Sequence, residues 1–165
     1  MLRVASTLKR VPRTDIFFGE EQHLLASYRR HHRCAGLLLD TPGLLDEADF
    51  HAHLASECLL KHVFCLLRYS LGLKASLPPE FGSLKTAKSF GHDVKVLAKV
   101  LVAHEAELGS YAPLLELLTL LSSGEDWNQD RYRSRAPSTA REANVRRILE
   151  VTNHIDSELG DADAE

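Results

Sequence analysis

The segment Ala48–Leu71, ADFHAHLASECLLKHVFCLLRYSL, decides the fold because its apolar residues cover most of the circumference of a helix. A helix of this kind lies at the centre of a bundle, in contact with other helices on several sides. A narrow polar stripe remains at His53, Glu57 and Lys61, which follow one another at intervals of four and therefore stack on one face. The sequence thus predicts a central helix that carries one line of polar groups.

Further helices are predicted around this one from apolar spacing and from helix start and stop signals. Their ranges are 19–39, 91–108, 112–122 and 138–159. The last is predicted to begin at Ser138 or Thr139, and Thr139 with Glu142 has the spacing of a capping box. No segment alternates with period two, so we predict an all-α, up-and-down bundle of four to five helices.

Composition places the chain among single-domain globular proteins, with 44% hydrophobic and 26% charged residues. We expect an N-terminal arm over 1–18, the bundle over 19–159 and an acidic tail over 160–165. No apolar run is long enough to span a bilayer, and there is no apolar segment typical of a secretory signal. Three cysteines inside helical patterns indicate reduced core thiols, so a cytoplasmic protein without a membrane partner is expected.

The net charge of −3 conceals a basic region. Residues 130–147 contain six arginines and only two acids, whereas the last ten residues hold five acids and no base. Such a patch suits phosphate or nucleic acid, although charge clusters are equally often a solvated face.

Three segments, taken in order, resemble the HEPN superfamily of helical bundles. The first is Ala55–Lys61, ASECLLK, which is similar to that family's Ala-x-Glu-x-x-x-Lys core segment. The second is Gly91–Leu97, GHDVKVL, similar to its Gly-His-Asp-Leu helix start. The third is Trp127, followed by Arg131-Tyr132-Arg133 and a long amphipathic helix.

This resemblance implies a homodimeric HEPN-like bundle that binds RNA or nucleotide and needs no cofactor. HEPN proteins occur in toxin–antitoxin and defence systems, often beside a nucleotidyltransferase partner. Many are metal-independent ribonucleases that use an Arg-x(4–6)-His motif, usually composed across a homodimer interface. The branch that this sequence most resembles generally lacks that motif.

The alternative function is a metal-independent endoribonuclease that uses Arg147 and His154, the only pair with the motif's spacing. His154 would move a proton at the ribose hydroxyl or the leaving oxygen, and Arg147 would stabilise phosphate charge. About two such pairs are expected by chance in a chain this rich in both residues. The polar residue that usually follows the motif's arginine is Ile148 here.

Glu57, Lys61, His92 and Asp93 form the second candidate site. If the polar stripe faces a cleft near His92 and Asp93, with His53 beside it, the cluster binds a polar ligand such as a nucleotide. The structural alternative is an intrahelical Glu57–Lys61 ion pair together with helix capping at His92-Asp93. The sequence leaves both interpretations open.

Arg131, Tyr132, Arg133 and Trp127 form the third candidate site, since guanidinium groups and aromatic faces suit phosphate contact and base stacking. For Trp127 the favoured alternative is a structural role, in which it anchors a long loop on the bundle. Cysteine–histidine spacing at Cys58, His62 and Cys65 falls short of a zinc motif, so no metal is predicted. A third possibility for the whole chain is a non-catalytic structural or interaction module.

Overall fold

The computed structural model describes residues 18–70, 92–103, 112–122 and 138–160. Five helices and no strand occur within these ranges. The all-α bundle of four to five helices is therefore confirmed. The predicted arm and acidic tail lie outside the described residues except for Phe18 and Gly160, which belong to helices, and the segment from Ser123 to Pro137 lies outside them entirely.

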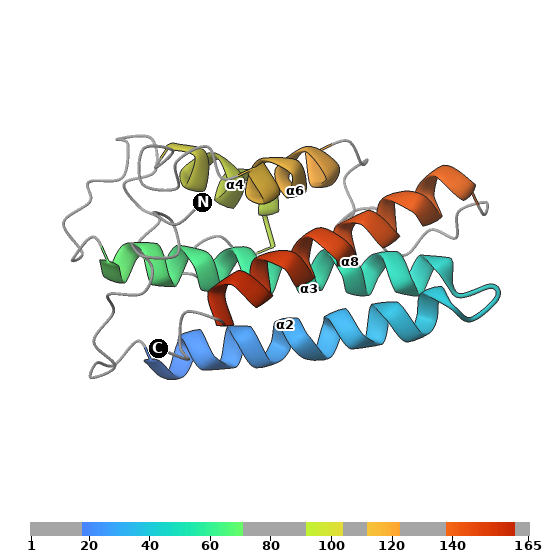
Figure 1. The fold of residues 1–165 in the computed structure, drawn as a ribbon, viewed down its shortest axis with the longest axis horizontal. Helices are drawn as coiled ribbons and strands as arrows, with labels where there is room; N and C mark the ends of the chain where they lie inside the picture. Colours follow the sequence, from blue (N-terminus) through green and yellow to red (C-terminus); the bar gives the residue numbers. More distant parts are fainter. Residues whose placement is uncertain (1–17, 71–91, 104–111, 123–137, 161–165) are drawn as a thin grey trace.

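A long hairpin forms the base of the bundle. Helix α2 (Phe18–Leu39) and helix α3 (Leu45–Ser70) run antiparallel and lie side by side over most of their length (Figure 1). Between them, Thr41 Oγ1 donates a hydrogen bond to the Leu37 carbonyl, and Gly43 adopts a φ of 84°. Glycine adopts this left-handed conformation without steric cost, so the chain can turn at Gly43, within the predicted break.

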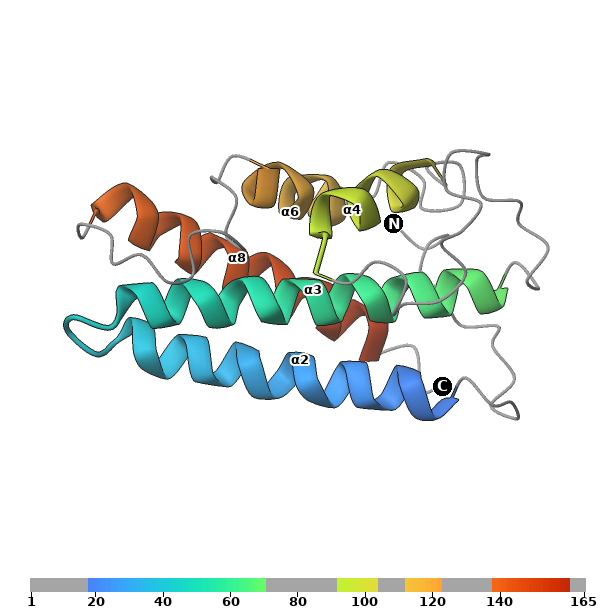
Figure 2. The same cartoon turned by 180° about the vertical axis from the view of Figure 1, so that it is seen from behind.

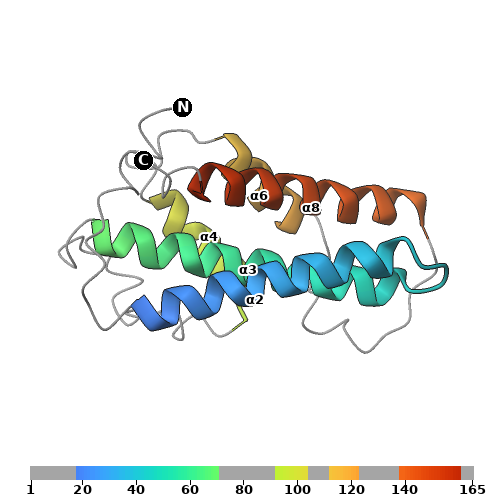
Figure 3. The ribbon, with the colours of Figure 1, turned by 60° about the horizontal axis from the view of Figure 1, so that its bottom comes forward.

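Helix α3 is the central element, with neighbours on more than one side. Helix α4 (Val94–Ala103) and helix α6 (Ala112–Ser122) lie together across α3 from α2, as Figure 2 shows from behind. Helix α8 (Thr139–Gly160) contacts α2, α3 and α6. Its N-terminal end lies at the N-terminal end of α3, so these two helices run in the same direction (Figure 3).

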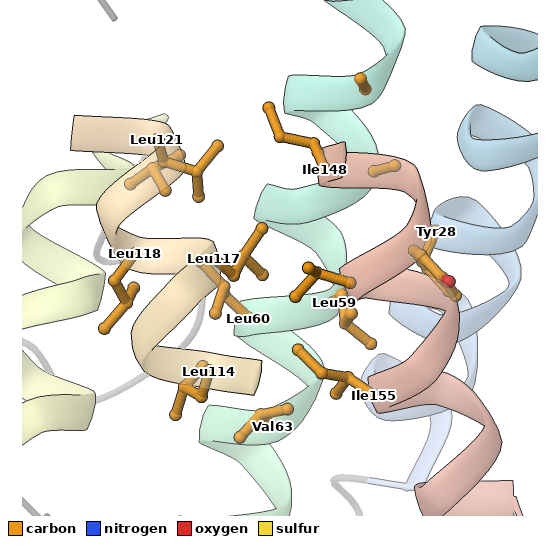
Figure 4. Packing of buried hydrophobic residues seen from close by; sticks show 14 of the residues in the cluster. Tyr28, Leu59, Leu60, Val63, Leu114, Leu117, Leu118, Leu121, Ile148 and Ile155 are labelled. Carbon is orange, nitrogen blue, oxygen red and sulfur yellow. The ribbon is translucent and has the colours of Figure 1, made fainter. Parts of the chain in front are cut away.

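Side chains from α3, α6 and α8 interdigitate to form the core (Figure 4). Leu59 and Leu60 on α3, Leu117 on α6, and Ile148 on α8 are fully buried. Burying each such side chain stabilises the fold by about 1.5–3 kcal/mol. The apolar circumference of α3 is the local reason for its central position, as the sequence predicted.

Of the two starts that the sequence allowed for α8, the structure has the one capped by Ser138, whose Oγ accepts from the Arg141 backbone N–H at 3.5 Å. The Ser138 carbonyl also accepts from the Glu142 N–H at 2.9 Å. The helix thus starts one residue earlier than the capping box required, and Glu142 is engaged instead by Arg146.

No helix in the described ranges is both long enough and apolar enough to cross a membrane.

Candidate functional site

The polar stripe of α3 centres on a buried ion pair. Lys61 Nζ donates to Glu57 Oε1 at 2.7 Å, and the two side chains are 11% and 5% exposed. The spacing of four residues along one helix places them in contact, as the sequence predicted. A charged pair so far from water must be closely matched, because each ion loses its hydration.

His92 joins this pair from a different part of the chain. Its Nδ1 lies 3.2 Å and 3.1 Å from the two carboxylate oxygens of Glu57. His92 precedes α4 and is 60% exposed, so it covers the buried carboxylate while its ring reaches solvent. The structure therefore brings together the two motif segments Ala55–Lys61 and Gly91–Leu97, which are about thirty residues apart along the chain.

Asp93 and His53, predicted near this cluster, have other roles. Asp93 Oδ1 accepts from the Val96 backbone N–H at 2.9 Å and so caps α4. His53 Nδ1 lies 2.9 Å from the Asp49 carbonyl oxygen and 3.1 Å from Asp49 Oδ1, one turn earlier on α3. The capping interpretation of Asp93 is the one that the geometry supports.

Arg147 is held by carboxylates on two helices. Its Nε and Nη2 donate to the two oxygens of Glu116 at 2.6 Å and 2.9 Å, and its Nη1 donates to Glu150 at 2.9 Å. These hydrogen bonds raise the pKa of Arg147, and Arg147 lowers the pKa of Glu116. His154 lies 3.6 Å from Glu158 instead. The positive charge proposed to stabilise phosphate is therefore already matched by two acids.

The other described arginines of the basic segment are neutralised in the same way. Arg141, only 14% exposed, forms ion pairs with Asp46 and Asp49 at the start of α3. Arg146 pairs with Glu142 at 3.0 Å and with Asp40 at 3.5 Å. The region that appears basic in the sequence is thus electrically balanced where it forms α8. The remaining candidates, Arg131, Tyr132, Arg133 and Trp127, lie outside the described residues.

The arginines of α2 were missed by the sequence-based reasoning. Arg29 forms a two-point hydrogen bond with Asp156 of α8, at 3.2 Å and 3.1 Å. Arg30 and Arg33 are exposed, and within the described part of the chain neither forms an ion pair. The run RRHHR at 29–33 is the sequence signal for a basic surface on α2. The sequence alone does not show which of its arginines form ion pairs with acidic residues in the folded chain.

The same stretch of α2 carries two histidines with defined partners. His31 Nδ1 lies 2.9 Å from His51 Nδ1 on α3, and burial lowers the pKa of both rings. His32 Nε2 lies 2.9 Å from the Leu149 carbonyl oxygen on α8. Both contacts hold α2 against its neighbours.

Metal-ligating residues do not gather in the described segments, where no group of three or more histidine, cysteine or acidic side chains is placed to hold an ion. Cys58 and Cys65 are half-buried on α3, and burial raises the pKa of the Cys58 thiol to about 11.

Comparisons with known proteins give no match: no family model, no curated protein and no solved structure matches the chain.

Proposed function

We propose that this chain is a HEPN-type helical bundle that binds RNA or a nucleotide without cleaving it. The observation that carries the proposal is the contact of Glu57 with both Lys61 and His92. These residues belong to two of the three segments on which the resemblance rests, and they meet in one polar cluster. As a homodimer beside a nucleotidyltransferase, in a toxin–antitoxin or defence system, the bundle would supply the binding surface.

The cluster has the properties of a ligand site. A buried ion pair stabilises a fold less than apolar residues of equal size, so its presence in a core favours a role beyond stability. His92 is exposed over most of its ring, so a ligand can contact it without unfolding the bundle. An imidazole held by a carboxylate is a suitable donor to phosphate or ribose oxygens.

Binding is favoured over cleavage by the state of Arg147 and His154. A ribonuclease of this type needs an arginine available to the phosphate, and Arg147 is engaged by Glu116 and Glu150. Replacement of those contacts by a substrate would leave two carboxylates beside the phosphate, which is unfavourable.

The test is ligand-induced stabilisation of the purified protein. Thermal melting is followed with each ribonucleoside triphosphate and with a short RNA, for the wild type, His92→Ala and His154→Ala. Both histidines are about half-exposed, so neither substitution should unfold the protein. We expect ligand to raise the melting temperature of the wild type and of His154→Ala, but not of His92→Ala. A wild type that responds to no nucleotide and binds no RNA rejects the proposal.

RNA incubated with the same proteins in EDTA separates binding from catalysis. Cleavage that persists without metal and disappears in His154→Ala would replace the binding function by the ribonuclease function. Light scattering tests the homodimer, which a monomeric mass would reject.

A further inference from the structure

We infer that α2 carries a second contact surface, which binds the phosphodiester backbone of RNA through Arg30 and Arg33. This inference rests on the proposed function and adds a second RNA-binding surface to it. That surface lies on α2 and not on α8, where the sequence had suggested a basic patch. These two residues form the α2 arginine face.

The two arginines share one side of α2. They are three residues apart, which places their side chains next to each other on a helix surface. Both are exposed. Among the described helices, α2 packs mainly against α3 and α8, and the ribbons of α4 and α6 lie on the other side of α3 (Figures 1 and 3).

The charge of this face is what separates it from the rest of the described surface. Arg30 has one hydrogen-bonded side-chain partner, Ser27 Oγ at 3.5 Å, which carries no charge. For the described residues, every arginine on α8 has at least one carboxylate within 3.5 Å. Arg29 is likewise matched by Asp156. Arg30 and Arg33 therefore have their charge available for an anionic partner.

Charge complementarity identifies that partner as a polyanion with repeated phosphates. A guanidinium presents a planar set of donors that matches phosphate oxygens, and adjacent arginines on one helix side can contact successive phosphates. Such contacts carry no sequence information and give an affinity that depends steeply on salt. RNA binding through this face is therefore expected to be sequence-tolerant.

The rigid support of α2 favours this use. Arg29, His31 and His32 each fasten the helix to a neighbour, through Asp156, His51 and the Leu149 carbonyl respectively. These contacts flank the two arginines along the chain. A contact surface fixed in this way loses less entropy on binding than one on a flexible segment.

The chain provides a matched control for the experiment. Arg146 and Arg147 are also exposed neighbours on one helix, and their removal changes the net charge equally, but both are paired with acids. Two double variants are therefore compared, Arg30→Ala/Arg33→Ala and Arg146→Ala/Arg147→Ala. Both remove two positive charges, but only the first removes arginines that have no carboxylate partner among the described residues.

Affinity is measured by fluorescence anisotropy with a labelled single-stranded RNA between about 50 and 200 mM salt. We expect Arg30→Ala/Arg33→Ala to raise the Kd at least about tenfold at the lower salt concentration. The slope of log affinity against log salt should fall by about 1.4, which corresponds to two lost phosphate contacts on a single strand. Arg146→Ala/Arg147→Ala should stay within about twofold of wild type, because its charges are already matched.

Equal losses in both double variants would show a non-specific charge effect and overturn the inference. So would an unchanged affinity in Arg30→Ala/Arg33→Ala, which would leave RNA binding to another surface and the proposed function intact. Binding to anionic vesicles and to polyglutamate is measured in the same way. If Arg30→Ala/Arg33→Ala weakens binding to either of these but leaves binding to RNA unchanged, the inference is also overturned. Circular dichroism establishes that both variants keep their helical content.

Discussion

The Nδ1 atoms of His31 on α2 and His51 on α3 lie 2.9 Å apart. One ring must donate and the other must accept, so at least one Nδ1 carries no proton. Burial is the main cause that lowers the pKa of both rings from 6.5. For His31, the neighbouring His51 and Arg30 lower the pKa further, while Glu57 opposes them. The hairpin is therefore joined by a contact that protonation of both rings would break.

This contact makes stability depend on pH. The folded pKa values lie below those of the unfolded chain, so the unfolded state takes up protons first as pH falls through 6.5. We expect the free energy of unfolding to decrease from neutral pH toward the lowered folded values. Urea denaturation of the wild type and of His31→Gln/His51→Gln checks this. The difference between them should be larger at neutral pH than in acid, and a difference independent of pH would contradict the argument.

Breaking the buried ion pair should be costly. Glu57→Gln leaves the Lys61 ammonium without its carboxylate in a buried position and also removes the partner of His92. The expected loss is about 3–5 kcal/mol in the free energy of unfolding. Adding Lys61→Met to Glu57→Gln should recover much of it, because the buried ammonium is then removed together with the carboxylate. If the double variant is as unstable as the single one, the pair is not what limits stability.

Arg141 and Arg146 both lie on α8, but their replacement by alanine should lower the free energy of unfolding by different amounts. Arg141 is 14% exposed and links α8 to Asp46 and Asp49. Its replacement by alanine should cost about 1.5–3 kcal/mol, the range for hydrogen bonds to charged groups. Arg146→Ala, at an exposed site where solvent screens its ion pairs, should cost clearly less. Chemical denaturation of both variants makes the comparison, and equal losses would argue against a buried link.

Leu59 tests the packing at the centre of the bundle. Leu59 lies on α3, is fully buried and faces α8 (Figure 4). Leu59→Ala should therefore lower the free energy of unfolding by about 2–5 kcal/mol. Leu37, 68% exposed near the end of α2, provides the control. Leu37→Ala should change stability by no more than about 0.5 kcal/mol. A small effect at Leu59 would mean that the core relaxes around the cavity.

Cys58 should react slowly with alkylating reagents. Burial is the largest cause that raises the pKa of its thiol to about 11, with Glu57 adding to the effect, so little thiolate exists at mildly alkaline pH. Timed iodoacetamide labelling followed by peptide mass spectrometry should show Cys58 labelled more slowly in the folded protein than in urea. Equal rates in the two states would indicate that α3 opens readily.

The sequence by itself determined the helices, because apolar spacing and chain breaks are local properties. It predicted α6 at its observed bounds and placed α2, α3 and α8 within a few residues of theirs. It also predicted the Glu57–Lys61 contact, since a spacing of four on one helix fixes that geometry. For the N-cap of α8 the sequence left Ser138 and Thr139 as alternatives, because each has a hydroxyl that can cap, and the structure has Ser138.

Only the tertiary structure decided which groups the charged side chains contact. Arg147 and His154 share a helix, but their partners Glu116 and Glu158 depend on how α6 packs against α8 and on rotamers along the helix. The contact of His92 with Glu57 required the packing of α4 against α3. The availability of Arg30 and Arg33 likewise depends on what α2 leaves uncovered. Charge pairing acts through space between distant segments, so among the described residues the arginines of α8 are each paired with an acid, whereas Arg30 and Arg33 of α2 are not.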